Sequence, residues 1–147
     1  IVRNNIFALN REGQVAVTRT EPHVSATFEK NIIVTSEQPI FAQVLPTPDG
    51  LPKHYSDLNL FWSTAGEVVM GGRADRDEAG NVVIKDTYSV EERLKTGKDT
   101  HSIFADPKFK DLVNWDFTLA EDSPAFELGF KAINTSDVGI RPLDKRC

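Results

Sequence analysis

A four-residue pattern recurs in the first half of the chain, and it constrains the fold more than any other feature. The pattern is Asn, an aliphatic residue, a bulky apolar residue and a further apolar residue, at residues 5–8, 31–34 and 59–62. The spacing is 26 residues from Asn5 to Asn31 and 28 residues from Asn31 to Asn59. Repeats of this length are typical of solenoids, in which successive coils of chain stack on one another.

The first 88 residues have the pattern of β-strands. Val24, Ala26 and Phe28 alternate with polar residues, which predicts a half-buried strand. Residues 67–70 and residues 81–85 flank glycine turn signals, so we expect them to form a hairpin that lies across the end of the main body. Strand-rich repeats without helices between them favour a β-solenoid, while a β-sandwich stays open on spacing alone.

The repeated asparagine has a physical reason in a solenoid. One coil cannot bury its own apolar face, but stacked coils place equivalent residues above one another and form a continuous core. Asparagine suits a repeated corner because it tolerates the left-handed backbone conformation and its side-chain amide can bond to the next coil. We therefore expect Asn5, Asn31 and Asn59 to occupy equivalent corners of successive coils.

The last part of the chain, residues 89–147, predicts a short helix and an irregular cap. Ser89 and Glu92 have the spacing of a capping box and Gly97 is a stop signal, so the helix is expected over residues 90–96. A solenoid also needs atypical sequence to cover its last coil. The apolar residues expected to provide this cover are Phe104, Phe109, Phe117, Leu119, Phe126, Leu128 and Phe130. Residues 1–88 and 89–147 are expected to form one structural unit.

Composition and charge narrow the functional classes. The chain has 147 residues, 39% of them hydrophobic and 27% charged, which suits one domain with a sizeable core. The net charge of −5 and the scattered cations argue against nucleic acid or an anionic membrane as the partner. No apolar run approaches the roughly 20 residues of a membrane span. The chain begins at Ile1 in a strand-like segment without a signal peptide, so we expect it to be a fragment of a longer chain.

An ordered series of short motifs fills the C-terminal third. The motifs are Gly-Lys-Asp-Thr-His-Ser, Ala-Asp-Pro-Lys-Phe, Asp-Phe-Thr-Leu, Ser-Pro-Ala and Leu-Gly-Phe, at residues 97–102, 105–109, 116–119, 123–125 and 128–130. In this order they resemble the C-terminal tail of bacterial right-handed parallel β-helix proteins that are described as polysaccharide-degrading enzymes of the pectin lyase-like kind. Residues 10–14 and 21–23 resemble the last full coils of the same family.

The resemblance implies an all-β fold: the terminal coils of a right-handed parallel β-helix, followed by a short helix and an irregular C-terminal cap. It also implies secretion or display at the cell surface, and a polysaccharide or oligosaccharide as the partner. The chain departs from the family at the end of the helix, where a Trp is common and Arg93-Leu94-Lys95 stands here. An open N-terminal coil would in addition permit self-association.

The polar strip of residues 10–23 holds the candidate site residues. Glycoside hydrolysis uses two carboxyl groups about 5–9.5 Å apart, and parallel strands about 4.8 Å apart can supply them from neighbouring coils. The candidate catalytic residues are Glu12 and Glu21, with Asp99 as a distant third. The candidates for binding sugar hydroxyls or a uronate carboxylate are Arg11, Gln14, Arg19 and His23. A solvated loop between coils explains the same strip without any function.

No metal site and no cofactor are expected. His54 and His101 are isolated in the sequence, and no spacing of His, Cys and Asp matches a zinc site. The acidic residues of 75–78 alternate but lack the calcium-loop pattern, so a solvated hairpin loop is expected there. Two functions remain open: the end of a glycoside hydrolase, and a non-catalytic glycan-binding or cell-surface structural β-helix module. In a weaker third alternative, the isolated chain is inactive and serves only as a cap.

Overall fold

The structure is a computed structural model that describes residues 1–11, 13–17, 23–43 and 54–134. Strands dominate these residues, beside one short α-helix and one 3-10 helix, so the chain is mostly β as predicted. In the described part of the chain, neither helical segment is long and apolar enough to cross a membrane.

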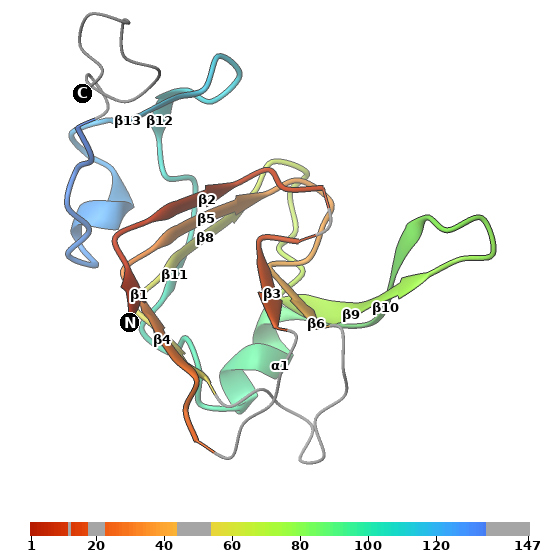
Figure 1. Cartoon of the computed structure of the whole chain (residues 1–147). Helices are drawn as coiled ribbons and strands as arrows, with labels where there is room; N and C mark the ends of the chain where they lie inside the picture. The colour runs from red at the N-terminus through yellow and green to blue at the C-terminus, as the bar shows by residue number, and fades with distance from the viewer. Residues whose placement is uncertain (12, 18–22, 44–53, 135–147) are drawn as a thin grey trace, which may run out of the picture.

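Three successive coils of chain each contribute one strand to each of three small sheets (Figure 1). The first coil holds β1 (Val2–Arg3), β2 (Ile6–Ala8) and β3 (Val15–Val17); the second holds β4 (Ala26–Glu29), β5 (Ile32–Thr35) and β6 (Phe41–Gln43); the third holds β7 (His54–Asp57), β8 (Leu60–Ser63) and β9 (Gly71–Arg76). The sheets have the orders β1-β4-β7, β2-β5-β8-β11 and β3-β6-β9-β10, with β10 at Val82–Tyr88 and β11 at Ile103–Phe104. In these three sheets, every pair of described strands is parallel except the β9–β10 hairpin.

The asparagine side chains stack as predicted. Asn5 Nδ2 donates to Asn31 Oδ1, and Asn31 Nδ2 donates to Asn59 Oδ1, each at 3.1 Å. The left-handed residues are those just before the asparagines: Asn4 (φ 58°), Lys30 (φ 54°) and Leu58 (φ 57°). The backbone role expected of the repeated asparagine is therefore wrong. Its role is hydrogen bonding from coil to coil.

The asparagine ladder ends on a buried ion pair. The N–H of Asn59 donates to Ser102 Oγ at 2.9 Å, and its side-chain amide lies 3.4 Å from Asp99 Oδ1. Arg93 Nε donates to Asp99 Oδ2 at 2.8 Å, and both side chains are at most 1% exposed. Arg93 comes from helix α1 (Val90–Lys95), which has the predicted capping box and ends with Thr96 as its C-cap.

Two apolar cores lie on opposite faces of the β2-β5-β8-β11 sheet. The inner core lies between the sheets, and its buried members are Phe28, Ile33, Ile40, Phe41, Phe61 and Met70. The outer core is formed by Ile32, Val34, Leu60, Ala125, Leu128 and Phe130. Because this sheet is buried on both faces, its strands read as unbroken apolar runs rather than as alternating ones.

The C-terminal tail covers the side of the coils and not the end that was predicted. Leu128 and Phe130 pack on the outer face of the β2-β5-β8-β11 sheet. Phe104 instead packs against the inner core, in register with Phe61, and Phe126 is 38% exposed. Before this segment the chain forms the hairpin of β12 (Phe109–Asp111) and β13 (Asp116–Leu119), and then the 3-10 helix η1 (Pro124–Phe126).

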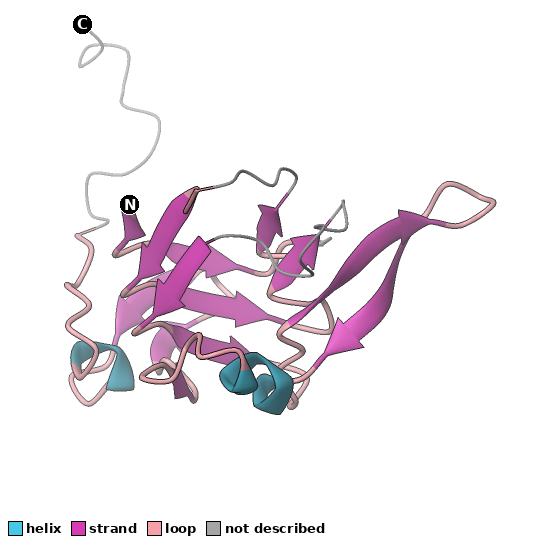
Figure 2. Ribbon diagram, turned by 90° about the horizontal axis from the view of Figure 1, so that it is seen from below, coloured by secondary structure: helices cyan, strands magenta, loops and turns pink. Residues whose placement is uncertain are grey.

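The predicted hairpin near the third coil is present but differs in place and direction. Its first strand is β9, which includes Gly71 and Gly72, and not residues 67–70. A Cβ at Gly71 would lie 2.3 Å from the ring of Tyr88, so only glycine fits where β10 crosses. The hairpin projects away from the coils and does not lie across their end (Figure 2).

Candidate functional site

The outer face of the β1-β4-β7 sheet carries a row of charged side chains. Successive residues of a strand point to opposite faces. Val2 and Phe28 pack in the inner core and are in register, so the next residues, Arg3 and Glu29, face outward. Asp57 is in register with Glu29 on the next strand and continues the row. We call Arg3, Glu29 and Asp57 the charged row.

A second row lies beside the charged row on the same face. Thr27 and Tyr55 are in register on β4 and β7, two residues before Glu29 and Asp57. Tyr55 is 49% exposed, so its ring and hydroxyl group are accessible on this face. The face therefore combines charges with hydroxyl groups and one aromatic ring, the polar and amphipathic groups that bind small polar molecules.

Glu29 and Asp57 form a pair of carboxylates on neighbouring parallel strands. Adjacent strands lie about 4.8 Å apart, which sets the spacing of the two side chains at their bases. Arg3 Nη1 lies 4.0 Å from Glu29 Oε1 at one end of the pair. At the other end, His101 Nδ1 lies 2.7 Å from Asp57 Oδ2.

The partners of Asp57 hold it in its ionised form. Partial burial raises the pKa of Asp57. The side-chain and backbone N–H groups of His101 and the backbone N–H of Leu58 lower it by more in total, so the pKa lies below the ordinary value. An ionised carboxylate can only accept, so Nδ1 of His101 donates to it and Nε2 is the ring nitrogen that remains for another partner. The His101 side chain is 73% exposed, so this nitrogen can reach a molecule on the outer face.

The residues predicted from the sequence are placed differently. Glu12, Arg19 and Glu21 lie outside the described residues, so the predicted catalytic pair stays a prediction. Arg11 and His23 are exposed.

Gln14 is 6% exposed, and its side-chain amide donates to the carbonyl of Asn10 at 3.4 Å and accepts from the N–H of Asn10 at 3.2 Å. These contacts give Gln14 a local structural role.

Two histidines that are isolated in the sequence have partners in the structure. His101 bonds to Asp57, and His54 Nε2 lies 3.2 Å from Arg93 Nη2. A signal for part of this site was present in the sequence. The 28-residue offset that relates Asn31 to Asn59 also relates Glu29 to Asp57.

The acidic residues of the β9–β10 hairpin shape the hairpin itself. Asp75 Oδ2 lies 2.8 Å from Lys85 Nζ, and Asp77 accepts hydrogen bonds from Asn81 that close the turn. Among the described residues, no group of three or more His, Cys, Asp or Glu side chains is arranged to hold a metal ion.

Comparison of the chain with protein-family models, curated proteins and solved structures finds no match. The geometry of the outer face and the motifs of the tail are therefore the observations that bear on function.

Proposed function

We propose that the chain forms the terminal coils of a right-handed parallel β-helix that acts on polysaccharides, as the end of a glycoside hydrolase. The parallel sheets shared by successive coils, the asparagine ladder and the ordered motifs of the tail support this proposal. The proposal includes secretion or display at the cell surface. Its central observation is the pair of carboxylates, Glu29 and Asp57, in register on the outer face of the β1-β4-β7 sheet.

The proposed chemistry follows from the difference between the two carboxylates. Glycosidases that retain configuration place their carboxyl groups about 5–5.5 Å apart, near the spacing of adjacent strands. Asp57 is held ionised by His101, which suits a nucleophile or a charge that stabilises the oxocarbenium-like transition state. Glu29 has Arg3 as its neighbour instead, at 4.0 Å, and in this mechanism it protonates the leaving oxygen. Arg3 and Tyr55 flank the pair and would bind sugar hydroxyls.

The test is the release of reducing ends from a panel of polysaccharides by the 147-residue chain. Glu29→Gln and Asp57→Asn should each lower the rate by about 10²-fold or more, as for loss of an acid–base group. Glu67→Gln is the matched control, because Glu67 is exposed in a loop and makes no ion pair within the described residues.

Three results would count against this proposal. Full activity in both variants removes the carboxylate pair from the mechanism. If Glu12→Gln with Glu21→Gln abolishes activity while the first pair does not, the catalytic role belongs to the residues predicted from the sequence. If the chain releases no reducing ends from any polysaccharide of the panel, the hydrolase proposal fails for this chain.

A non-catalytic glycan-binding module is the second candidate, and one observation favours it. The β12–β13 hairpin exposes Val113 (87%) and Trp115 (62%), and the Trp115 ring centre lies 6.1 Å from that of Phe117. Exposed aromatic rings in a polar setting are typical of binding surfaces. This candidate predicts binding to a glycan array that Trp115→Ala abolishes and Asp57→Asn leaves unchanged, without release of reducing ends.

A further inference from the structure

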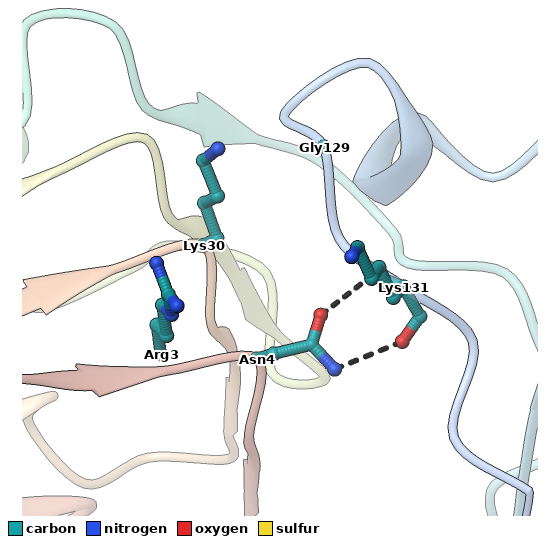
Figure 3. Close-up of a pocket in the computed structure, with 5 residues that line it drawn as sticks. All are labelled: Arg3, Asn4, Lys30, Gly129 and Lys131. Atoms are coloured by element: carbon teal, nitrogen blue, oxygen red, sulfur yellow. Dashed lines mark hydrogen bonds between the residues drawn. The ribbon is translucent and has the colours of Figure 1, made fainter.

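A cavity of about 390 Å³ lies where the corners of the first two coils meet the C-terminal tail (Figure 3). Its lining residues are Arg3, Asn4, Lys30, Gly129 and Lys131. Arg3 and Lys30 rise side by side from the ends of neighbouring strands, and Lys131 reaches in from the tail. We call this cavity the cationic pocket.

The fold holds the walls of the cationic pocket in place. The N–H of Asn4 donates to the carbonyl of Lys30 at 2.9 Å, which stacks the two left-handed corners. The Asn4 side chain then bonds to the backbone of Lys131 in both directions, with Nδ2 3.0 Å from its carbonyl oxygen and Oδ1 2.6 Å from its nitrogen. Gly129 (φ 78°) lies against the end of the Lys30 side chain. Residues that are 127 positions apart are thereby fixed to one another.

The positive charge of the cationic pocket is only partly compensated. Within the described residues, Lys30 and Lys131 make no ion pair, and Arg3 meets Glu29 only at 4.0 Å. This cluster stands in a chain whose net charge is −5. Like charges that share a cavity repel one another, and an anion between them removes that cost. Arg3 also belongs to the charged row, so the pocket adjoins the candidate site.

We propose that the cationic pocket binds an oxyanion carried by the saccharide, a carboxylate or a sulfate ester. This inference rests on the proposed function, because the sugar chain that lies along the outer face is what brings the anion to the pocket. The guanidinium of Arg3 offers a bidentate fork, while the ammonium groups of Lys30 and Lys131 act as point charges. The substrate class is therefore an anionic polysaccharide, and the pocket binds one sugar beside the charged row.

Titration calorimetry of the 147-residue chain with defined trisaccharides tests the proposal. The probes are trigalacturonate, its uncharged methyl ester and a sulfated galactose trisaccharide. We expect the anionic probes to bind and the methyl ester to bind at least about tenfold more weakly, a difference of about 1.4 kcal/mol. Added salt should weaken the binding of the anionic probes, because the exposed charges are screened.

The variant Lys30→Gln with Lys131→Gln should weaken the binding of the anionic probes by about tenfold or more. It preserves the clamp, because Asn4 bonds only to the backbone of Lys131. Lys110→Gln is the matched control, since Lys110 is exposed on β12 and outside the pocket. Thermal unfolding of each variant verifies that the fold is intact.

The outcomes separate this inference from the proposed function. Equal affinity for trigalacturonate and its methyl ester, or unchanged affinity in the double lysine variant, overturns the pocket. Binding of only the carboxylate probe or only the sulfated probe identifies the anion. If the pocket binds its probe while Glu29→Gln and Asp57→Asn leave hydrolysis unchanged, the pocket stands and the catalytic proposal falls. If hydrolysis depends on the carboxylate pair while no anionic probe binds, the catalytic proposal stands and the pocket falls.

Discussion

Replacing Asn31 by alanine should cost far more stability than replacing Asn5, although both side chains belong to the same ladder. The Asn31 side chain is 1% exposed and makes five hydrogen bonds. It accepts two from Asn5 and donates to Asn59 Oδ1 and to the carbonyls of Val2 and Glu29, at 3.0–3.1 Å.

The expected loss of stability follows from the polar groups that the substitution leaves without partners. A hydrogen bond contributes about 0.5–1.5 kcal/mol net, and a buried group left without its partner costs about 1–3 kcal/mol. Water can replace some of these hydrogen bonds at the open first coil, so Asn31→Ala should cost about 3–5 kcal/mol of stability. Asn5 donates only two side-chain bonds and is exposed, so Asn5→Ala should cost about 1 kcal/mol or less.

Urea unfolding followed by circular dichroism measures both costs. Asn31→Asp adds a second readout, because a buried carboxyl group can donate only when it is protonated. Its native pKa should be raised above the unfolded value of about 3.9. This variant should therefore recover stability as the pH falls toward 4, and lose it again as the pH rises. If Asn31→Ala costs no more than Asn5→Ala, the buried hydrogen bonds of the ladder do not stabilise the coils.

Four further results are expected. His101→Ala removes the imidazole donor that lowers the pKa of Asp57 and keeps the backbone N–H donor of residue 101. A carboxyl-carbon NMR titration should therefore show that pKa rising, and an unchanged value would refute the contact with the imidazole. Burial lowers the pKa of Lys98 to about 8, below its unfolded value of about 10.4. The charge of Arg93 also lowers this pKa, and the charge of Asp99 raises it. The unfolded state then binds more protons between these values, so stability should rise with pH from about 8 to 10.4, and Lys98→Met should abolish that rise in urea titrations. Arg93→Met leaves Asp99 buried without its cation and should cost about 3–5 kcal/mol, whereas Arg93→Met with Asp99→Asn should unfold at a higher urea concentration than the single variant. Finally, β1, β2 and β3 are edge strands, so the chain should self-associate with concentration, and a strict monomer in sedimentation at high concentration would contradict this.

The sequence predicted the stacking of coils because the repeat marks one fixed corner. Asn5, Asn31 and Asn59 lie next to apolar residues that repeat with them, and the register follows the same offsets. The place of the tail was not predictable in the same way. Leu128 and Phe130 have no periodicity that distinguishes packing on the end of the coils from packing on their side. That choice depends on the second apolar face of the sheet, which only the three-dimensional packing reveals.

The candidate site was predictable in part. Glu29 and Asp57 share the offset of the repeat, so the known register places them side by side. The contact of Asp57 with His101 spans 44 residues, an offset that no repeat in the sequence provides. The hairpin and helix α1 lie between those two residues, and their length sets the offset. The cationic pocket depends on Lys131 of the tail, so its place also follows from tertiary packing.

The end of the ladder at Asn59 explains the buried ion pair of Arg93 and Asp99. Each asparagine needs an acceptor on the following coil for its backbone N–H, and for Asn59 that acceptor is Ser102 in place of a further asparagine. Ser102 Oγ itself donates to Asp99 Oδ1 at 3.0 Å, and a carboxylate without exposure requires a cation. Arg93 supplies it, and its guanidinium carbon lies 4.4 Å from the ring centre of Phe41, over the inner core. Helix α1 therefore carries the cation that neutralises Asp99 at the end of the ladder. The same side chain covers the inner core at Phe41.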